Sequence, residues 1–265
     1  MTTGRIPCWQ VDAFTSRPFG GNPAAVCWLE EVADAEWMQN VAAEMNLAET
    51  AFVRRLAHGF ELRWFTPTIE VDLCGHATLA SAHVLWTVGL VADGLPIRFH
   101  TRSGVLTCSR SGPLIELDFP ATPAVPITPP AGLAAALGAS PREALQSKFD
   151  YLAIYESAGV IRALQPDVRA LKAFPVRGII VSALSDDPRY AFLARFFGPA
   201  SGIDEDPATG SAYCSLLPYW SAILNETELT AYQASRRGGE FWLRLAGDRV
   251  ILRGHAVTIW QGELL

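Results

Sequence analysis

The chain has 265 residues, of which half are hydrophobic and 18% are charged, and 21 Lys and Arg against 27 Asp and Glu leave a formal net charge of −6. This hydrophobic content excludes a disordered chain, and the acidic balance argues against nucleic acid as a partner. The most apolar run, residues 77–92, contains His83 and stops at Asp93. It is too short for a membrane span, so we expect no contact with a membrane.

The N-terminal residues and the cysteines predict a cytoplasmic protein. The chain enters a strand-like run almost at once and shows no apolar signal-peptide region. Its five cysteines are an odd number without a C-x-x-C pair, which is typical of reduced thiols rather than of a disulfide framework.

The first half of the chain alternates strand-like and helical patterns. Asp34 is a good N-cap before apolar residues at helical spacing, and Gly75 with His76 opens a second helix. We predict strands at residues 5–14, 24–29, 50–54, 60–65, 97–101, 105–109 and 114–119, and helices from residue 34 and over residues 75–90.

Five prolines between residues 120 and 130 mark the predicted boundary between two lobes. We assign residues 1–119 to an N-terminal lobe and residues 120–265 to a C-terminal lobe, with the last strand packing back on the first lobe as an alternative. In the second half we predict helices at residues 130–137 and 167–173 and a long helix from about Thr209. Predicted strands are residues 151–155, 160–164, 178–183, 229–234, 241–245, 250–253 and 256–260.

The two halves share short motifs in the same order, which indicates an internal duplication. R-W-F-T-P at residues 63–67 matches R-F-F-G-P at residues 195–199, an offset of 132. G-H-A at residues 75–77 matches G-S-A at residues 210–212, an offset of 135, and each leads into a predicted helix. Two similar lobes would create a cleft, which is a preferred place for a small ligand.

Each copy of the motif places a glycine and a polar residue at a helix start. Gly75 and Gly210 let a ligand approach the backbone, and the exposed N–H groups of a first helical turn bind anions. Two such starts would bind a carboxylate or stabilise an enolate-like charge. Ordinary helix capping explains the same residue types, and the sequence leaves both interpretations open.

Two titratable residues are candidates for proton transfer. Glu49 lies at the entry of an apolar strand, where partial burial would raise its pKa and suit it to act as a general acid or base. His76, at a helix N-terminus, would have a lowered pKa and donate a hydrogen bond as a neutral ring. The alternatives are a solvated loop acid and a structural histidine.

Other catalytic motifs are absent from the sequence. There is no G-x-G-x-x-G, no phosphate-binding loop, no H-E-x-x-H and no G-x-S-x-G. The five histidines are scattered along the chain, so we predict no metal site.

Seven segments spread over the chain form one further pattern: residues 11–14, 19–26, 46–53, 63–67, 74–78, 205–212 and 254–257. Taken together, they resemble the phenazine-biosynthesis (PhzF-like) isomerase family of the diaminopimelate epimerase superfamily, nearly from end to end. The resemblance implies an α+β fold of two pseudo-symmetric lobes, each a curled mixed β-sheet or barrel around a central α-helix, and commonly a homodimer.

The resemblance also implies roles for individual residues. Glu49 matches the general acid/base that moves a proton between carbons of the substrate, without a cofactor. A second set matches the residues that bind the substrate and position the proton: Gly75, His76, Asp206, Gly210 and Ser211.

Related amino-acid racemases use two cysteines, one in each lobe, and here the sequence departs from that pattern. Cys74 matches the first thiol, whereas Thr209 occupies the place of the second. A threonine hydroxyl is too weak an acid or base for paired-thiol chemistry. Cys74 is then a packing residue, or a reactive thiol at a helix start.

We therefore predict a cofactor-independent isomerase that acts on a small carboxylate-bearing substrate in a cleft between the lobes. Glu49, His76 and Asp206 are the predicted catalytic residues, and Gly75, Gly210 and Ser211 are predicted to bind the substrate. A thiol-dependent amino-acid epimerase that uses Cys74 is one alternative. A catalytically inactive binding protein is the other.

Overall fold

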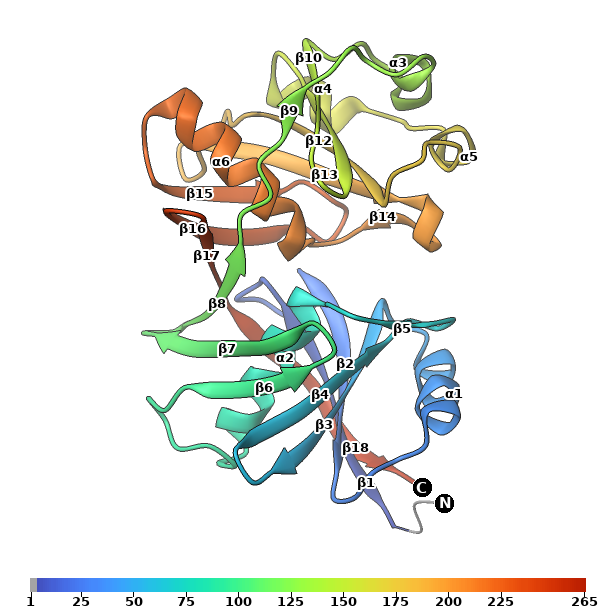
Figure 1. Cartoon of the computed structure of the whole chain (residues 1–265), viewed down its shortest axis with the longest axis vertical. Helices are drawn as coiled ribbons and strands as arrows, with labels where there is room; N and C mark the ends of the chain where they lie inside the picture. The colour runs from blue at the N-terminus through green and yellow to red at the C-terminus, as the bar shows by residue number, and fades with distance from the viewer. Residues whose placement is uncertain (1–3) are drawn as a thin grey trace. The chain divides into compact units, whose positions relative to one another are not determined.

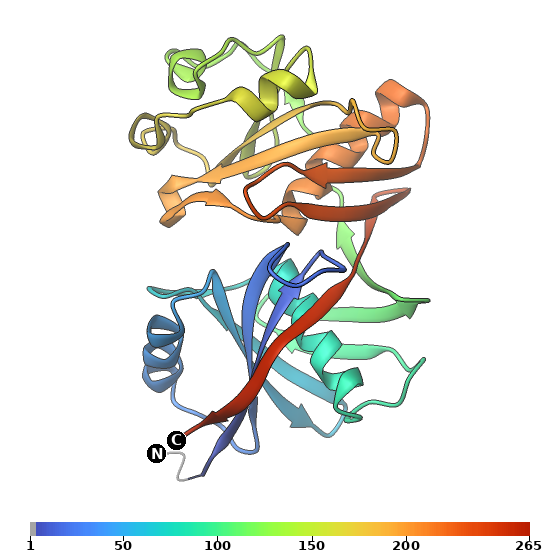
Figure 2. The same cartoon turned by 180° about the vertical axis from the view of Figure 1, so that it is seen from behind.

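The computed structural model describes residues 4–265, which divide into two compact units (Figure 1). Among these residues, unit 1 consists of residues 4–118 and 253–265, and unit 2 consists of Phe119–Leu252. The last strand, β18 (Ala256–Leu264), pairs antiparallel with β1 (Ile6–Ala13) in unit 1 (Figure 2). This is the alternative that accompanies the assignment of residues 120–265 to a C-terminal lobe.

Unit 1 is a mixed sheet that curls around a central helix, α2 (Figure 1). Along the sheet, β1 is antiparallel to β2, β2 parallel to β3, β3 antiparallel to β4 and β4 parallel to β6, and β7 and β8 follow as an antiparallel meander. The remaining elements of unit 1 are β2 (Asn22–Leu29), α1 (Ala35–Met45), β3 (Glu49–Leu56), β4 (Gly59–Phe65), β5 (Glu70–Val71), α2 (Gly75–Thr87), β6 (Ile97–Thr101), β7 (Gly104–Ser111) and β8 (Leu114–Pro120), which runs into unit 2.

Helix α2 is the core of unit 1. Ten of its 13 residues are buried, so the helix is enclosed on nearly every face rather than along one stripe. Alanine, leucine and valine make up most of this surface, and Thr78 and Ser81 bond their hydroxyls to the carbonyls of Cys74 and Ala77, one turn earlier. These internal bonds allow polar side chains to be buried without outside partners.

Unit 2 is a second curled mixed sheet with its own buried helix, α6 (Figure 2). Its elements are β9 (Val125–Pro126), α3 (Leu133–Leu137), β10 (Glu143–Gln146), β11 (Asp150–Ile154), α4 (Ala158–Ala163), α5 (Val168–Leu171), β12 (Gly178–Leu184), β13 (Phe192–Gly198), η1 (Pro199–Ser201), β14 (Ile203–Asp206), η2 (Gly210–Ala212), α6 (Tyr213–Leu224), β15 (Glu228–Gln233), β16 (Gly239–Ala246) and β17 (Arg249–Gly254), which runs back into unit 1.

The two units repeat one order of strand pairings. In unit 2, β10 is antiparallel to β11, β11 parallel to β12, β12 antiparallel to β13 and β13 parallel to β15, as in the series from β1 to β6. In both units a short strand, β5 or β14, also pairs antiparallel with the fourth strand and precedes the central helix. The lobes are therefore pseudo-symmetric, as the sequence predicts.

The shared R-aromatic-F motif has a structural explanation in this repeat. Arg63 on β4 makes two hydrogen bonds to Glu70 on β5, both of 2.8 Å. Arg195 on β13 makes the matching pair to Glu205 on β14, at 2.7 and 2.9 Å. Each arginine thus ties its strand to the short segment that leads to the helix start.

Most predicted elements form, but three expectations were wrong or incomplete. Residues 160–163 belong to helix α4 rather than to a strand, and Leu164 is the C-cap of that helix. Ser157 caps its other end by accepting from Val160 N at 3.4 Å. Short apolar runs such as this one fit a strand or a buried helix equally well. Five strands were not predicted, namely β5, β9, β10, β13 and β14, and the helix near Thr209 begins with the 3₁₀ turn η2.

Truncating the buried face of α2 should destabilise the protein strongly. Leu79 is fully buried, so Leu79→Ala is expected to lower the free energy of unfolding by about 2–5 kcal/mol, measured by urea titration. Leu95 is 58% exposed and serves as the control, since Leu95→Ala should change stability by only about 0.5 kcal/mol. Equal losses in the two variants would contradict the central role of α2.

Candidate active site

In unit 1, the fold brings Glu49, Cys74 and His76 together. Glu49 is the first residue of β3, Cys74 is the N-cap of α2, and His76 is the second residue of that helix. His76 Nε2 lies 3.2 Å from Glu49 Oε2, and Cys74 Sγ lies 3.5 Å from His76 Nδ1. The imidazole therefore lies between a thiol and a carboxylate.

His76 is a neutral ring in this setting. Burial lowers its pKa from 6.5 to about 3, because the charged imidazolium would lose its hydration. From the sequence we also predict a lowered pKa for His76, but as an effect of the helix N-terminus. In the structure, burial of the ring is the cause. The Glu49 side chain beside it is only 12% exposed.

Among residues 4–265, these three side chains form a group that could hold a metal ion. One ligand atom from each of Glu49, Cys74 and His76 lies within 4.8 Å of the other two. Thiolate, imidazole and carboxylate are the ligands that zinc takes in proteins. Sequence spacing predicts no metal site because these ligands come from two elements that are distant in the chain.

In unit 2, Asp206, Thr209 and Gln233 form a buried hydrogen-bonded group. Thr209 donates its hydroxyl to Asp206 Oδ2. Gln233 Oε1 accepts from Thr209 N at 2.8 Å, and Gln233 Nε2 donates to the Asp206 carbonyl at 2.7 Å. Thr209 is thus a hydrogen-bond partner of Asp206, the predicted catalytic aspartate.

Gly210 and Ser211 lie in the 3₁₀ turn η2, directly before helix α6. The N-cap of this turn, Thr209, makes no side-chain hydrogen bond to the turn's own N–H groups. Ser211 Oγ accepts a hydrogen bond of 3.0 Å from Arg177 Nη1.

The predicted residues fall into two sets. Glu49, Gly75 and His76 belong to unit 1, whereas Asp206, Gly210 and Ser211 belong to unit 2. Sequence reasoning missed Gln233 and Arg177, which contact the second set. No local motif marks them, since each meets its partner from a strand or strand start more than 20 residues away in the chain.

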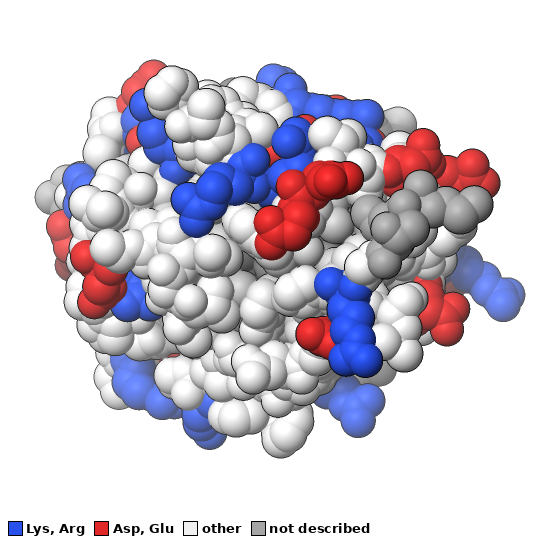
Figure 3. All heavy atoms as spheres, turned by 90° about the horizontal axis from the view of Figure 1, so that it is seen from below, with Lys and Arg blue, Asp and Glu red and all other residues white. Residues whose placement is uncertain are grey.

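The charged residues on the face shown in Figure 3 are mixed. Lys and Arg alternate with Asp and Glu and are separated by uncharged surface, so this face presents no continuous basic patch. Among the helices of residues 4–265, none has the length and apolar character needed to cross a membrane.

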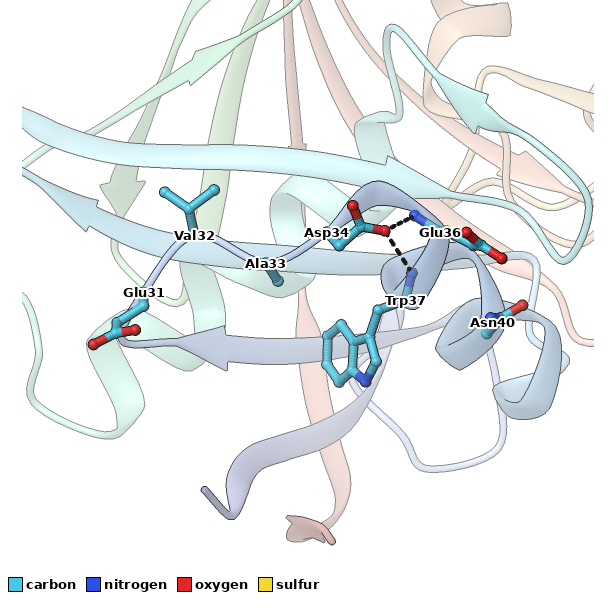
Figure 4. Close-up of a pocket in the computed structure, with 7 residues that line it drawn as sticks. All are labelled: Glu31, Val32, Ala33, Asp34, Glu36, Trp37 and Asn40. Carbon is cyan, nitrogen blue, oxygen red and sulfur yellow. Dashed lines mark hydrogen bonds between the residues drawn. The ribbon is translucent and has the colours of Figure 1, made fainter. Parts of the chain in front are cut away.

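A surface pocket of about 420 Å³ lies at the N-terminal end of α1 (Figure 4). The Asp34 carboxylate in its lining already accepts from the N–H groups of Glu36 and Trp37 at 2.8 and 3.4 Å. None of the six predicted site residues lines this pocket. It therefore belongs to the capping of α1 rather than to the candidate active site.

Comparisons with known proteins agree with this fold. Residues 11–262 match the family model of phenazine biosynthesis-like (PhzC–PhzF) proteins. A protein of Halalkalibacterium halodurans named as an uncharacterized isomerase is 50% identical, over 100% of this chain and 99% of the relative. The crystal structure of a PhzF-family protein of Enterococcus faecalis has a TM-score of 0.93 and 41% identity, covering 99% of this chain and 100% of that one.

A protein of Pseudomonas aeruginosa described as a predicted epimerase has a TM-score of 0.77 at 23% identity, over 99% of each chain, and so shares the fold. Fold, site and relatives together define the chain as an isomerase. It belongs to the phenazine biosynthesis-like (PhzC–PhzF) family.

The buried neutral His76 should make stability fall in mild acid. Its pKa of about 3 in the folded state lies below the 6.5 of the unfolded chain, so the unfolded state binds the extra proton between these values. Between pH 7 and pH 5, this residue alone should lower the free energy of unfolding by about 2 kcal/mol.

Urea titrations at both pH values would measure this effect. His76→Gln should lack that part of the acid loss, whereas the exposed His58→Gln should retain it. The same pH dependence in wild type and His76→Gln would show that His76 is not the residue responsible.

Proposed function

We propose that this isomerase works without a cofactor, moving a proton between two carbons of a small carboxylate-bearing substrate. Glu49 is the general acid and base of this proposal. The single observation that supports it best is the 3.2 Å approach of Glu49 Oε2 to the buried, neutral His76. A neutral ring places no full positive charge beside the carboxylate.

The proton transfer has two steps. The Glu49 carboxylate takes a proton from a carbon next to the unsaturated, carboxylate-bearing system, and the electron pair delocalises into that system as an enolate. The protonated Glu49 then returns the proton to a different carbon, which shifts the double bond. Both steps use one group, so the net reaction consumes no other reactant.

His76 positions the carboxylate in this scheme. Its Nε2 lies 3.2 Å from Glu49 Oε2, and its Nδ1 lies 3.5 Å from Cys74 Sγ. The buried ring fills the space beside the carboxylate and so limits the orientations that the Glu49 side chain can take. Gly75 presents its N–H group at the start of α2.

We propose that Asp206, Gly210 and Ser211 bind and orient the substrate. The resemblance to the family supports these roles, and the bonds of Asp206 to Thr209 and of Ser211 to Arg177 hold both side chains in place. The first turn of η2 and α6 offers N–H donors that favour an anionic group.

Replacing Glu49 should abolish most of the proton transfer. Glu49→Gln keeps the size of the side chain but removes the base, so we expect a loss of about 10²–10⁴-fold in rate. The measurement is incorporation of solvent deuterium into a panel of cyclic hydroxy-acids and amino acids. The control is Glu44→Gln on the exposed face of α1, which should exchange at the wild-type rate.

Unchanged exchange in Glu49→Gln would refute the assigned role. A wild type that is stabilised thermally by these compounds yet exchanges none of them would instead identify a binding protein that has lost the chemistry.

The second candidate function is a thiol-dependent amino-acid epimerase. The 3.5 Å contact between Cys74 and His76 favours it, because an imidazole beside a thiol can activate the thiolate. The two functions differ in what they require of Cys74.

Cys74→Ser separates the two candidates. A serine hydroxyl is a far weaker acid than a thiol, so the epimerase should lose at least about 10²-fold in exchange at the α-carbon of amino acids. The glutamate-based isomerase should keep its rate within about tenfold. Retained exchange in Cys74→Ser would exclude the thiol mechanism, and loss in both Cys74→Ser and Glu49→Gln would show that both groups take part.

We also propose that the protein is a cytoplasmic homodimer. Its five cysteines are free thiols, including Cys8 and Cys27, whose sulfur atoms are 3.3 Å apart and share a hydrogen bond rather than a disulfide, which suits a reducing compartment.

A further inference from the structure

In unit 2, Arg177 makes three hydrogen bonds with one guanidinium group. Its Nε and Nη2 donate to the two carboxylate oxygens of Asp150 at 2.9 and 2.5 Å, and its Nη1 donates to Ser211 Oγ at 3.0 Å. The Asp150 side chain is only 1% exposed, while that of Arg177 remains 36% exposed. The arginine thus connects a buried anion to the helix start that carries Ser211.

Backbone pairing and aromatic packing hold this guanidinium in place. Asp150 opens β11 and lies in register with Gly178, the residue after Arg177. The guanidinium carbon lies 5.4 Å from the centre of the Phe149 ring and 5.5 Å from that of Phe196. Gly178 makes room for the second ring, because a Cβ there would come within 2.2 Å of Phe196.

The bond from Arg177 decides what the Ser211 hydroxyl can do. A hydroxyl has one hydrogen and two lone pairs, and here a lone pair is taken by a cationic donor. Its own hydrogen is then available to a further acceptor, and a charged donor on the oxygen polarises the O–H bond. The Arg177–Ser211 pair is accordingly a donor array, complementary to an acceptor oxygen and not to an ammonium group.

We propose that Arg177 is a positioning residue that holds Ser211 as a hydrogen-bond donor to a carboxylate oxygen of the substrate. This inference rests on the proposed function, which makes Ser211 a substrate-binding residue. Arg162 of unit 2 makes a comparable two-bond pair with Asp186, and these two bonds involve no residue of the predicted site.

Calorimetric titration with benzoate tests the proposal, with its uncharged isostere benzamide as the matched ligand. Wild type should bind benzoate more tightly than benzamide. Arg177→Lys keeps the charge beside Asp150 but cannot make all three bonds at once, so its Kd for benzoate should rise about tenfold or more, with benzamide little changed. Arg162→Lys is the control and should bind both ligands like wild type.

A double-mutant cycle separates positioning from simple structural support. Ser211→Ala should weaken benzoate binding about as much as Arg177→Lys does, and the double variant should be no weaker than either single variant. An Arg177→Lys protein of lower thermal stability but unchanged Kd would overturn the proposal. Additive losses, or a wild type without preference for benzoate, would overturn it as well.

The benzoate titrations test the Arg177–Ser211 pair separately from the role of Glu49. Glu49→Gln should lose deuterium exchange and still bind benzoate in preference to benzamide. If Glu49→Gln keeps its exchange, the proposed function fails, but the benzoate titrations of the Arg177 and Ser211 variants still report on the carboxylate site.

Discussion

Helix α2 contributes ten of its 13 residues to the interior of unit 1, so the curled sheet has to enclose it almost completely. This enclosure has a chemical consequence at the helix start. His76, which would titrate near neutrality in water, is held as a neutral ring against the carboxylate of Glu49. Burial of one helix thereby both stabilises the unit and prepares the group that the proposed reaction needs.

Unit 2 uses the same architecture with different side chains. In each unit an arginine, Arg63 or Arg195, makes two hydrogen bonds to a glutamate of the short strand that precedes the helix start. Beyond these strands the units diverge. Unit 1 presents a carboxylate, an imidazole and a thiol, whereas unit 2 presents the Asp206–Thr209 pair and the serine held by Arg177. A shared scaffold therefore carries different sets of polar side chains at its two helix starts.

Much of the fold could be predicted from local patterns. Asp34 before apolar residues at helical spacing correctly marked α1, since capping and amphipathic period are properties of neighbouring residues. The apolar run at residues 160–164 misled the prediction, because a run of that length has no period and only the Ser157 cap decides for a helix. Strand β13 lay within a recognised motif but was not predicted, as its pairing with β12 and β15 is non-local.

The sequence by itself determined the family, the repeated motifs and the types of residue at each helix start, because these depend on residues that are neighbours in the chain or on similarity to relatives. Only the tertiary structure decided that Glu49 and Cys74 meet on opposite sides of the His76 ring, and that burial keeps this ring neutral. It likewise decided that Arg177 and Gln233 reach Ser211 and Thr209. The physical reason is that dehydration and side-chain contact depend on distance in space, which sequence spacing does not encode across separate strands.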